Sequence, residues 1–135
     1  MNRIKKLLEA IQTHKSVEQI RKLLTPSWFG FKKACNVNDT LGIGVASPLN
    51  VASFAGRIDV VKLLLDYGAD VNYQDKSGYS ALLWAASQGY TQIVEMLINK
   101  GADVNKKNVA GNSALIFATR GNHTKMVGLL TLHHA

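Results

Sequence analysis

A tandem repeat constrains the fold of this chain more than any other feature. Ser47 and the G-A-D-V-N motif at 68–72 return as Ser80 and G-A-D-V-N at 101–105. In each copy an alanine-rich apolar segment is followed, after a glycine, by a second segment with apolar residues at helical spacing. A fixed period of this kind is typical of a stacked array, in which no copy can bury its apolar face without a neighbour.

The residues of the first copy carry a family resemblance. Residues 47–50 read S-P-L-N, and residues 58–72 read I-D-V-V-K-L-L-L-D-Y-G-A-D-V-N. This order resembles the ankyrin repeat, a β-turn followed by two antiparallel helices, and the resemblance covers residues 47–118. It implies an all-α solenoid of about four helix-turn-helix repeats joined by β-turn or hairpin loops.

The chain departs from the family's T-P-L-H motif in all three clear copies. The motif reads S-P-L-N at 47–50, S-A-L-L at 80–83 and S-A-L-I at 113–116. A serine remains to cap each helix, but the histidine that helps to tie neighbouring repeats in the family is replaced each time. We therefore expect serine-capped helices in an array less rigid than the family pattern gives.

The length of 135 residues suits one domain of about four repeats. The spacing divides it into a degenerate N-terminal capping repeat, two full repeats and a C-terminal repeat or cap: residues 1–40, 41–74, 75–107 and 108–135. The chain stops without a further G-A-D-V-N, which is either a natural C-terminal cap or a truncation. Gly128 weakens the last helix, so we expect it to fray from about Thr131. The periodicity predicts helices near residues 4–14, 17–24, 48–55, 58–66, 81–88, 91–99, 114–120 and 124–130.

The first repeat is indicated by apolar spacing rather than by the motif. A shift of 41 places Leu8 on Leu49. The excess over the period predicts an insertion, most of which lies at residues 25–33. Three aromatic residues and two lysines follow one another closely there: Trp28, Phe29, Phe31, Lys32 and Lys33. The aromatic side chains either cover the helices of the first repeat or stay exposed and anchor a partner, with the lysines adding electrostatic attraction.

The positive charge of the chain is concentrated near its start. The net charge is +7, and residues 1–40 hold eight Lys and Arg and three Asp and Glu, a net of +5. A basic solvated face is the commoner explanation, and the alternative is a binder of nucleic acid or acidic lipid. That binder would use the basic side chains of the N-terminal repeat: Arg3, Lys5, Lys6, Lys15, Arg21, Lys22, Lys32 and Lys33.

The sequence contains no recognisable catalytic or metal-binding motif. Cys35 is its single cysteine, which excludes an intramolecular disulfide and paired-cysteine zinc sites. The four histidines lack metal-ligand spacing, and no phosphate-binding glycine loop or nucleophile elbow is present. Asp70, Asp75 and Asp103 match turn positions that hold hairpins by side-chain hydrogen bonds. We expect no enzymatic activity, no metal and no cofactor.

Localisation is inferred from the absence of a secretion or membrane signal in this sequence. Lys5, Lys6 and Glu9 interrupt the apolar run that a signal peptide would need at the start of the chain, and the uncharged run 41–56 is too short to span a bilayer. We expect a monomer in the cytoplasm or another intracellular compartment. Ankyrin proteins also occur as effectors that intracellular bacteria secrete into host cells, and the lysine and asparagine enrichment here is compatible with that source.

The resemblance also implies where a partner protein binds. Ankyrin arrays bind proteins through their hairpin tips and the exposed positions of their first helices, which line a concave face. Carried to this chain, the partner-binding residues are Phe54, Lys76, Ser77, Tyr79, Gln88, Asn112 and Arg120. We expect Phe54, Tyr79 and Arg120 to be solvent-facing anchors. Trp84 is interpreted as core packing at the helix face, with a rim contact as the less common alternative.

Overall fold

The computed structural model describes residues 3–25, 37–38, 40 and 45–135. Within these ranges the chain forms eight helices and no strand, and an isolated β-bridge pairs Lys107 with Ser113. The helices are α1 (Arg3–Gln12), α2 (Val17–Leu24), α3 (Pro48–Phe54), α4 (Ile58–Asp66), α5 (Ala81–Gln88), α6 (Thr91–Asn99), α7 (Ala114–Arg120) and α8 (Thr124–Leu132). The predicted all-α solenoid is confirmed.

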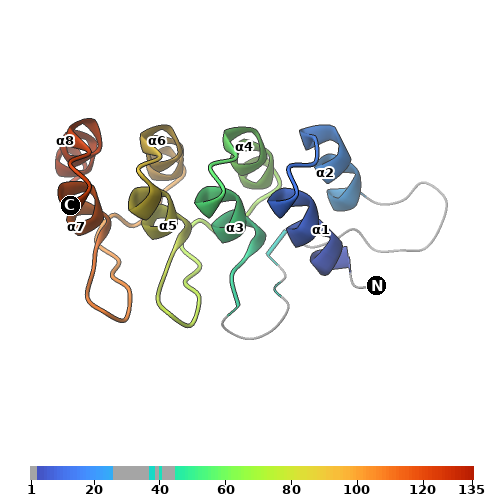
Figure 1. Cartoon of the computed structure of the whole chain (residues 1–135), viewed down its shortest axis with the longest axis horizontal. Helices are drawn as coiled ribbons and strands as arrows, with labels where there is room; N and C mark the ends of the chain where they lie inside the picture. Colours follow the sequence, from blue (N-terminus) through green and yellow to red (C-terminus); the bar gives the residue numbers. More distant parts are fainter. Residues whose placement is uncertain (1–2, 26–36, 39, 41–44) are drawn as a thin grey trace.

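The helices stand as antiparallel pairs in sequence order (Figure 1). Helices α1, α3, α5 and α7 form one row and α2, α4, α6 and α8 the other, while the loops that join α4 to α5 and α6 to α7 project to one side. Each helix contacts its partner in the pair and the corresponding helix of the next pair. The apolar core therefore runs continuously through the stack, as the repeat predicts. None of the described helices has the length and apolar character needed to cross a membrane.

Serine caps and alanine contacts recur as predicted. The hydroxyl oxygens of Ser47, Ser80 and Ser113 accept hydrogen bonds from backbone N–H groups three residues later, at 3.2, 3.3 and 3.4 Å. The alanines that recur at one position of the first helices are fully buried, because the two helices of a repeat approach closely there: Ala52, Ala85 and Ala118.

The first repeat is in a different register from the predicted one. The N–H of Lys15 donates to the carbonyl oxygen of Ala10 at 3.0 Å, as that of Arg57 donates to Ala52 at 3.1 Å. Ala10 thus corresponds to Ala52, and the predicted alignment of this helix is wrong by one position. Leu7, not Leu8, takes the place of Leu49 in the core.

Two helix ends also differ from the predictions. Helix α1 ends at Gln12 rather than near residue 14, because His14 adopts a left-handed conformation with φ 57°. Helix α8 continues through Leu132, two residues beyond its predicted end at residue 130. His134 has φ 68°, and the N–H of Ala135 donates to Leu130 at 3.0 Å. This closing turn matches that of Gly101 and Ala102, one period earlier in the chain.

Asparagine side chains tie each repeat to the next. Nδ2 of Asn72 donates to the carbonyl oxygen of Gly101 at 3.2 Å, and its Oδ1 accepts from the N–H of Asp103 at 2.8 Å. Asn38 makes the same pair of bonds with Gly68 and Asp70. Successive copies of the motif therefore hold neighbouring hairpins in register.

A second tie replaces one of the missing histidines. Asn50 stands at that position in its repeat, and its Nδ2 donates to the carbonyl oxygen of Tyr79 in the next repeat at 3.2 Å. Leu83 and Ile116, at the corresponding positions, carry no donor. Of the three clear copies of the motif, only the copy at residues 47–50 therefore has a side chain that replaces the contact of the lost histidine.

Candidate functional site

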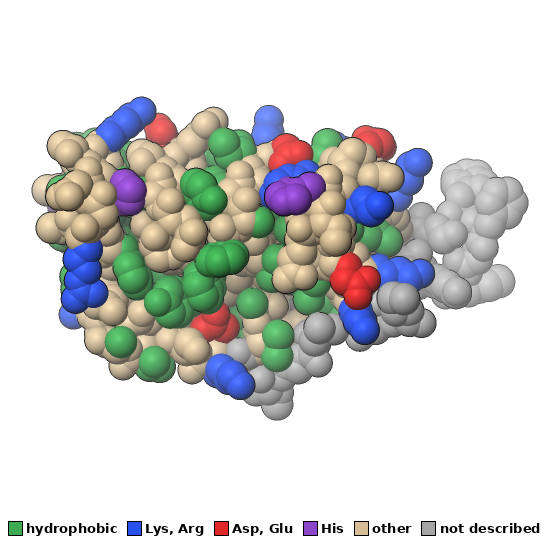
Figure 2. All heavy atoms as spheres, in the orientation of Figure 1, with side chains coloured by type: hydrophobic (Ala, Val, Ile, Leu, Met, Phe, Trp, Pro, Cys, Tyr) green, Lys and Arg blue, Asp and Glu red, His purple; other side chains and the backbone are tan. Residues whose placement is uncertain are grey.

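Aromatic side chains gather on the face formed by α1, α3, α5, α7 and the hairpins. We call Phe54, Tyr79, Trp84 and Phe117 the aromatic cluster. The Tyr79 ring stacks on Trp84 with centroids 4.1 Å apart, and Phe54 meets Trp84 edge-on at 5.2 Å. Tyr79 also approaches Phe117 at 5.9 Å. Figure 2 shows this face, with hydrophobic side chains gathered over its middle.

The carboxylate of Asp75 links the hairpin to the aromatic cluster. Its Oδ1 accepts hydrogen bonds from the N–H groups of Ser77 and Tyr79, both at 3.0 Å. Its Oδ2 accepts from the indole N–H of Trp84 at 3.2 Å. The predicted turn role of Asp75 is confirmed, and the same carboxylate fixes the orientation of the Trp84 ring.

The face is hollowed between α1 and α3 and on toward α5. Three adjoining pockets of about 340, 180 and 350 Å³ share Gln12 and Val51 among their lining residues, and we call them together the α1–α3 groove. The middle pocket is lined by Gln12, Ala46, Asn50, Val51, Phe54 and Trp84. Lys5 and Glu9 border the groove at one end, and His14 and Tyr90 border it at the other.

Two of the predicted partner-binding residues border this groove. Phe54 is 49% exposed and lines two of the three pockets, and Gln88 lines the one beside Tyr90. Phe54 is therefore exposed as predicted.

The prediction of a solvent-facing Tyr79 is wrong. Its side chain is half-buried because the ring stacks on the indole of Trp84, which removes apolar surface of both rings from water. Tyr79 is consequently part of the folded hairpin.

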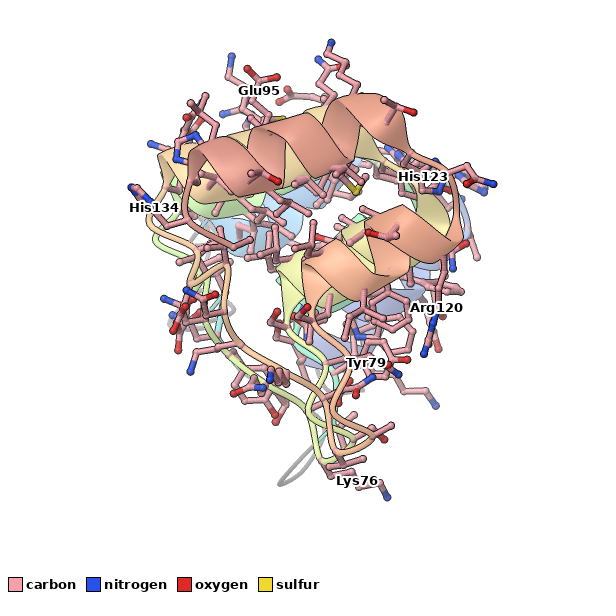
Figure 3. All side chains as sticks on the ribbon, turned by 90° about the vertical axis from the view of Figure 1, so that its left-hand side faces the viewer. Lys76, Tyr79, Glu95, Arg120, His123 and His134 are labelled. Atoms are coloured by element: carbon pink, nitrogen blue, oxygen red, sulfur yellow. The ribbon has the colours of Figure 1, made fainter. Side chains whose placement is uncertain are left out.

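The remaining predicted residues lie outside the groove. Lys76 and Ser77 are exposed at the hairpin tip. Nη1 of Arg120 donates to Oδ1 of Asn112 at 3.2 Å, so these two side chains hold each other on the last repeat. Figure 3 places Tyr79 and Arg120 on one side of the stack and Lys76 at its lower end. The predicted secondary contact, Trp28, Phe29, Phe31, Lys32 and Lys33, falls outside the described residues.

Trp84 lies at the rim of the core, the less common of its two predicted positions. Helix α5 turns Leu82, Leu83, Ala85 and Ala86 into the core, and Trp84 lies on the opposite, half-buried side. A signal existed in the repeat, because Val51 and Phe117 occupy the same position one period away and also lie on this face. Gln12 was missed because the register of α1 was misassigned by one residue.

The described residues offer no cluster suited to a metal ion, since no three His, Cys, Asp or Glu side chains among them lie close enough together. The polar groups on the face are instead amides, single charges and the Asp75 carboxylate, which is already occupied by three donors. The arrangement can bind a partner by apolar contact and hydrogen bonding.

Comparison with known proteins places these features in a family. A family model described as ankyrin repeats (three copies) matches residues 7–108 and 49–135. Over 47 residues the chain is 45% identical to "Probable E3 ubiquitin-protein ligase XBOS33" of Oryza sativa subsp. japonica, covering 35% of this chain and 9% of that protein. Over 52 residues it is 38% identical to "Protein phosphatase 1 regulatory subunit 27" of Mus musculus, covering 38% and 34%.

A bacterial relative matches a longer stretch. The chain is 29% identical over 77 residues to "Putative ankyrin repeat protein" of Borreliella burgdorferi, covering 52% of this chain and 35% of that protein. In all three matches the chain spans a minor part of the relative's length. The family model, by contrast, matches most of the chain, which therefore belongs to the ankyrin repeat family, a family of protein-interaction modules.

Proposed function

We propose that this chain is a non-catalytic module that binds a partner protein through its hairpin tips and the face containing the α1–α3 groove. The observation that carries the proposal is the exposed ring of Phe54 beside the groove. An exposed large apolar side chain bordering a hollow is typical of a binding site, and aromatic residues contribute much of the binding energy at interfaces.

The name of one relative supports a binding role. This relative is named as a regulatory subunit of a phosphatase. We place the module in the cytoplasm or another intracellular compartment. The more specific form of the proposal is that it is a secreted effector that acts inside a host cell.

Site-specific photocrosslinking tests the proposed face. The photoreactive residue p-benzoylphenylalanine is introduced in place of Phe54 and, as a matched control, in place of Glu95, an exposed residue of α6. Figure 3 places Glu95 at the top of the stack, away from Tyr79 and Lys76. After irradiation in extract of the native cell, we expect a crosslinked protein from position 54 that mass spectrometry identifies and that position 95 does not give.

Equal crosslinking from both positions, or from position 95 alone, would contradict the proposed face. A competing candidate is binding of nucleic acid or acidic lipid by the N-terminal repeat, where five basic side chains are exposed: Lys5, Lys6, Lys15, Arg21 and Lys22. Binding through several phosphate contacts weakens steeply with salt. A complex that persists in high salt therefore favours the groove, and one lost between low and moderate salt favours the basic surface.

A further inference from the structure

We infer that the middle pocket of the α1–α3 groove receives the phenol ring of a tyrosine side chain of the partner, whose hydroxyl donates a hydrogen bond to Oδ1 of Asn50. This inference rests on the proposed function, because it names the group that the groove recognises. It is carried by three properties of the pocket, namely its size, its walls and the unpaired amide oxygen of Asn50.

The size of the pocket fits one six-membered ring. Its volume is about 180 Å³, and an apolar protein cavity of about 150 Å³ is known to hold benzene. The pocket opens onto its two neighbours in the groove, and a short aliphatic side chain would leave part of the space empty. A phenyl or phenol ring fits this space.

The walls of the pocket suit an aromatic ring. Phe54 and Trp84 meet at an interplanar angle of 79°, so the two rings form a corner rather than a flat surface. Ala46 and Val51 add methyl groups to the lining. A third ring in this corner can meet its neighbours edge-on or offset-stacked, the arrangements that aromatic rings prefer.

Asn50 supplies the chemical selectivity. It lines the pocket and is only 1% exposed. Its Nδ2 donates to the carbonyl oxygen of Tyr79, which fixes the orientation of the amide, because the flipped amide would bring two oxygens together. Its Oδ1 has no hydrogen-bond partner among the described residues and is covered by its neighbours, which must shift for a hydroxyl in the pocket to reach it.

An unpaired buried acceptor is costly, so a ligand that brings a donor is favoured over one that does not. A phenol has such a donor, and a phenyl ring of the same size has none. The feature is also particular to this pocket, because the corresponding residues of the next two repeats, Leu83 and Ile116, have apolar side chains. The groove therefore combines a hollow that fits a ring with a buried, unpaired acceptor, and tyrosine satisfies both.

The inference is tested with p-cresol, which carries the tyrosine ring and hydroxyl, and toluene, which lacks the hydroxyl. Each is titrated into the ¹⁵N-labelled chain while the signals of the Trp84 indole N–H and the Asn50 side-chain amide are followed. We expect p-cresol to shift both signals and to bind at least about fivefold more tightly than toluene, the difference that one hydrogen bond gives.

The variant Asn50→Leu removes the acceptor and introduces the residue that the next repeat already carries at this position. We expect it to bind the two probes equally. Phe54→Ala removes a wall at an exposed site, and we expect it to weaken both probes together. Thermal unfolding of each variant checks that the fold is kept, and the comparison of probes on the unaltered chain decides the question if Asn50→Leu does not fold.

Equal affinity of the unaltered chain for p-cresol and toluene would overturn the role of Asn50. Absence of binding by both would overturn the inference altogether. Either result leaves the proposed function standing as long as position 54 crosslinks the partner and position 95 does not, so the two failures are distinguishable.

Discussion

Positions 56 and 89 have no room for a side chain, because a residue of the following repeat packs against each of these glycines. A Cβ atom on Gly56 would lie 2.7 Å from Cζ of Tyr90, and one on Gly89 would lie 2.5 Å from Cε1 of His123. Both glycines also have positive φ, at 72° and 79°, which disfavours any other residue. Backbone conformation and close approach therefore require glycine together.

Replacement of two glycines by alanine separates these causes. Gly101 has φ 90° and nothing within 4 Å of its Cβ position, whereas Gly89 has φ 79° and the His123 ring. We expect Gly101→Ala to destabilise by about 1–2 kcal/mol through the left-handed backbone alone. Gly89→Ala should destabilise by roughly 1 kcal/mol more, since the imidazole must move.

Urea unfolding of both variants, with and without His123→Ala, measures the difference. In the His123→Ala background the two substitutions should cost nearly the same free energy. An unchanged gap in that background would show that the His123 ring is not the obstacle.

The alanine between the two helices of the third repeat gives a second test. We expect Ala85→Leu to destabilise by roughly 1–3 kcal/mol, because Ala85 is fully buried between close helices. The control Lys100→Leu changes an exposed residue and should shift stability by less than about 0.5 kcal/mol. Equal urea midpoints for the two variants would contradict the register.

The predictions for single residues were correct where one local rule determines the contact that a side chain makes. Serine caps and turn aspartates bond to backbone within a few residues, so spacing alone identifies them. The exposure of the Tyr79 side chain was not predicted correctly, because it depends on stacking with Trp84. Neither spacing nor composition shows that a hairpin residue will stack on the next helix.

At the scale of the elements, the hairpins are held by one recurring acceptor. In the third repeat it is Asp75, and in the fourth it is Asn108, whose Oδ1 accepts from the N–H groups of Ala110 and Asn112, both at 3.0 Å. The two hairpins also contact each other, since the N–H of Val109 donates to Ser77 at 3.1 Å. These two hairpin tips thus form one continuous edge beside the aromatic cluster.

Substitution of Asp75 distinguishes its two roles. Asp75→Ala removes all three acceptor bonds, and we expect it to destabilise by about 2 kcal/mol. Asp75→Asn keeps the two backbone bonds, as Asn108 does, and loses the Trp84 bond, because an amide nitrogen cannot accept. It should cost under about 1 kcal/mol.

The Trp84 environment provides the second readout. In a Trp28→Phe background Trp84 is the single tryptophan, and both substitutions should shift its fluorescence to the red as the ring is freed. A shift with Asp75→Ala but not with Asp75→Asn would contradict the assigned contact between Asp75 and the indole.

The positions of the helices themselves were predictable, because apolar periodicity determines where each one lies. The exceptions were the ends of α1 and α8. There, His14 and His134 adopt the left-handed turn that glycine usually supplies. The sequence rule looks for glycine, whereas the stack imposes the turn at that position whatever the residue.

At the scale of the whole molecule, Arg57 joins the N-terminal repeat to the rest of the stack. Its Nη2 donates to the carbonyl oxygen of Lys15 at 2.9 Å and to Oδ2 of Asp59 at 3.1 Å. Its hydrogen bond to the Asp59 carboxyl lowers the pKa of that group below its usual 3.8, against a smaller opposing effect of partial burial. The carboxylate therefore holds the guanidinium in position for the inter-repeat bond.

Acid should weaken this junction. The pKa of Asp59 is lowered in the folded state, so the stability it contributes is fully present above the unfolded pKa of about 3.9 and is lost as pH falls through the lower folded value. Hydrogen exchange of α1 and α2 should then accelerate relative to that of α7 and α8. Asp59→Asn should remove this selective pH effect, whereas Asp66→Asn in the same helix should keep it.

The order of the helix pairs followed from the period, whereas the position of the binding face comes from the family resemblance and stays a prediction. The location of the hollow on that face did not follow from the sequence, because it depends on how α1 meets α3. Residues 25–47, where the period of the repeat is interrupted, separate these two helices in the sequence.

The ties between repeats point in both directions along the chain. Asn72 reaches forward to the next copy, while Arg57, Tyr90 and His123, which occupy one position of successive copies, reach back to the preceding one. A unit of one period, cut at any point, carries one forward and one backward attachment. Duplication of residues 75–107 would therefore create junctions of a kind that the chain already contains, and the gene could lengthen by whole units without new compensating substitutions.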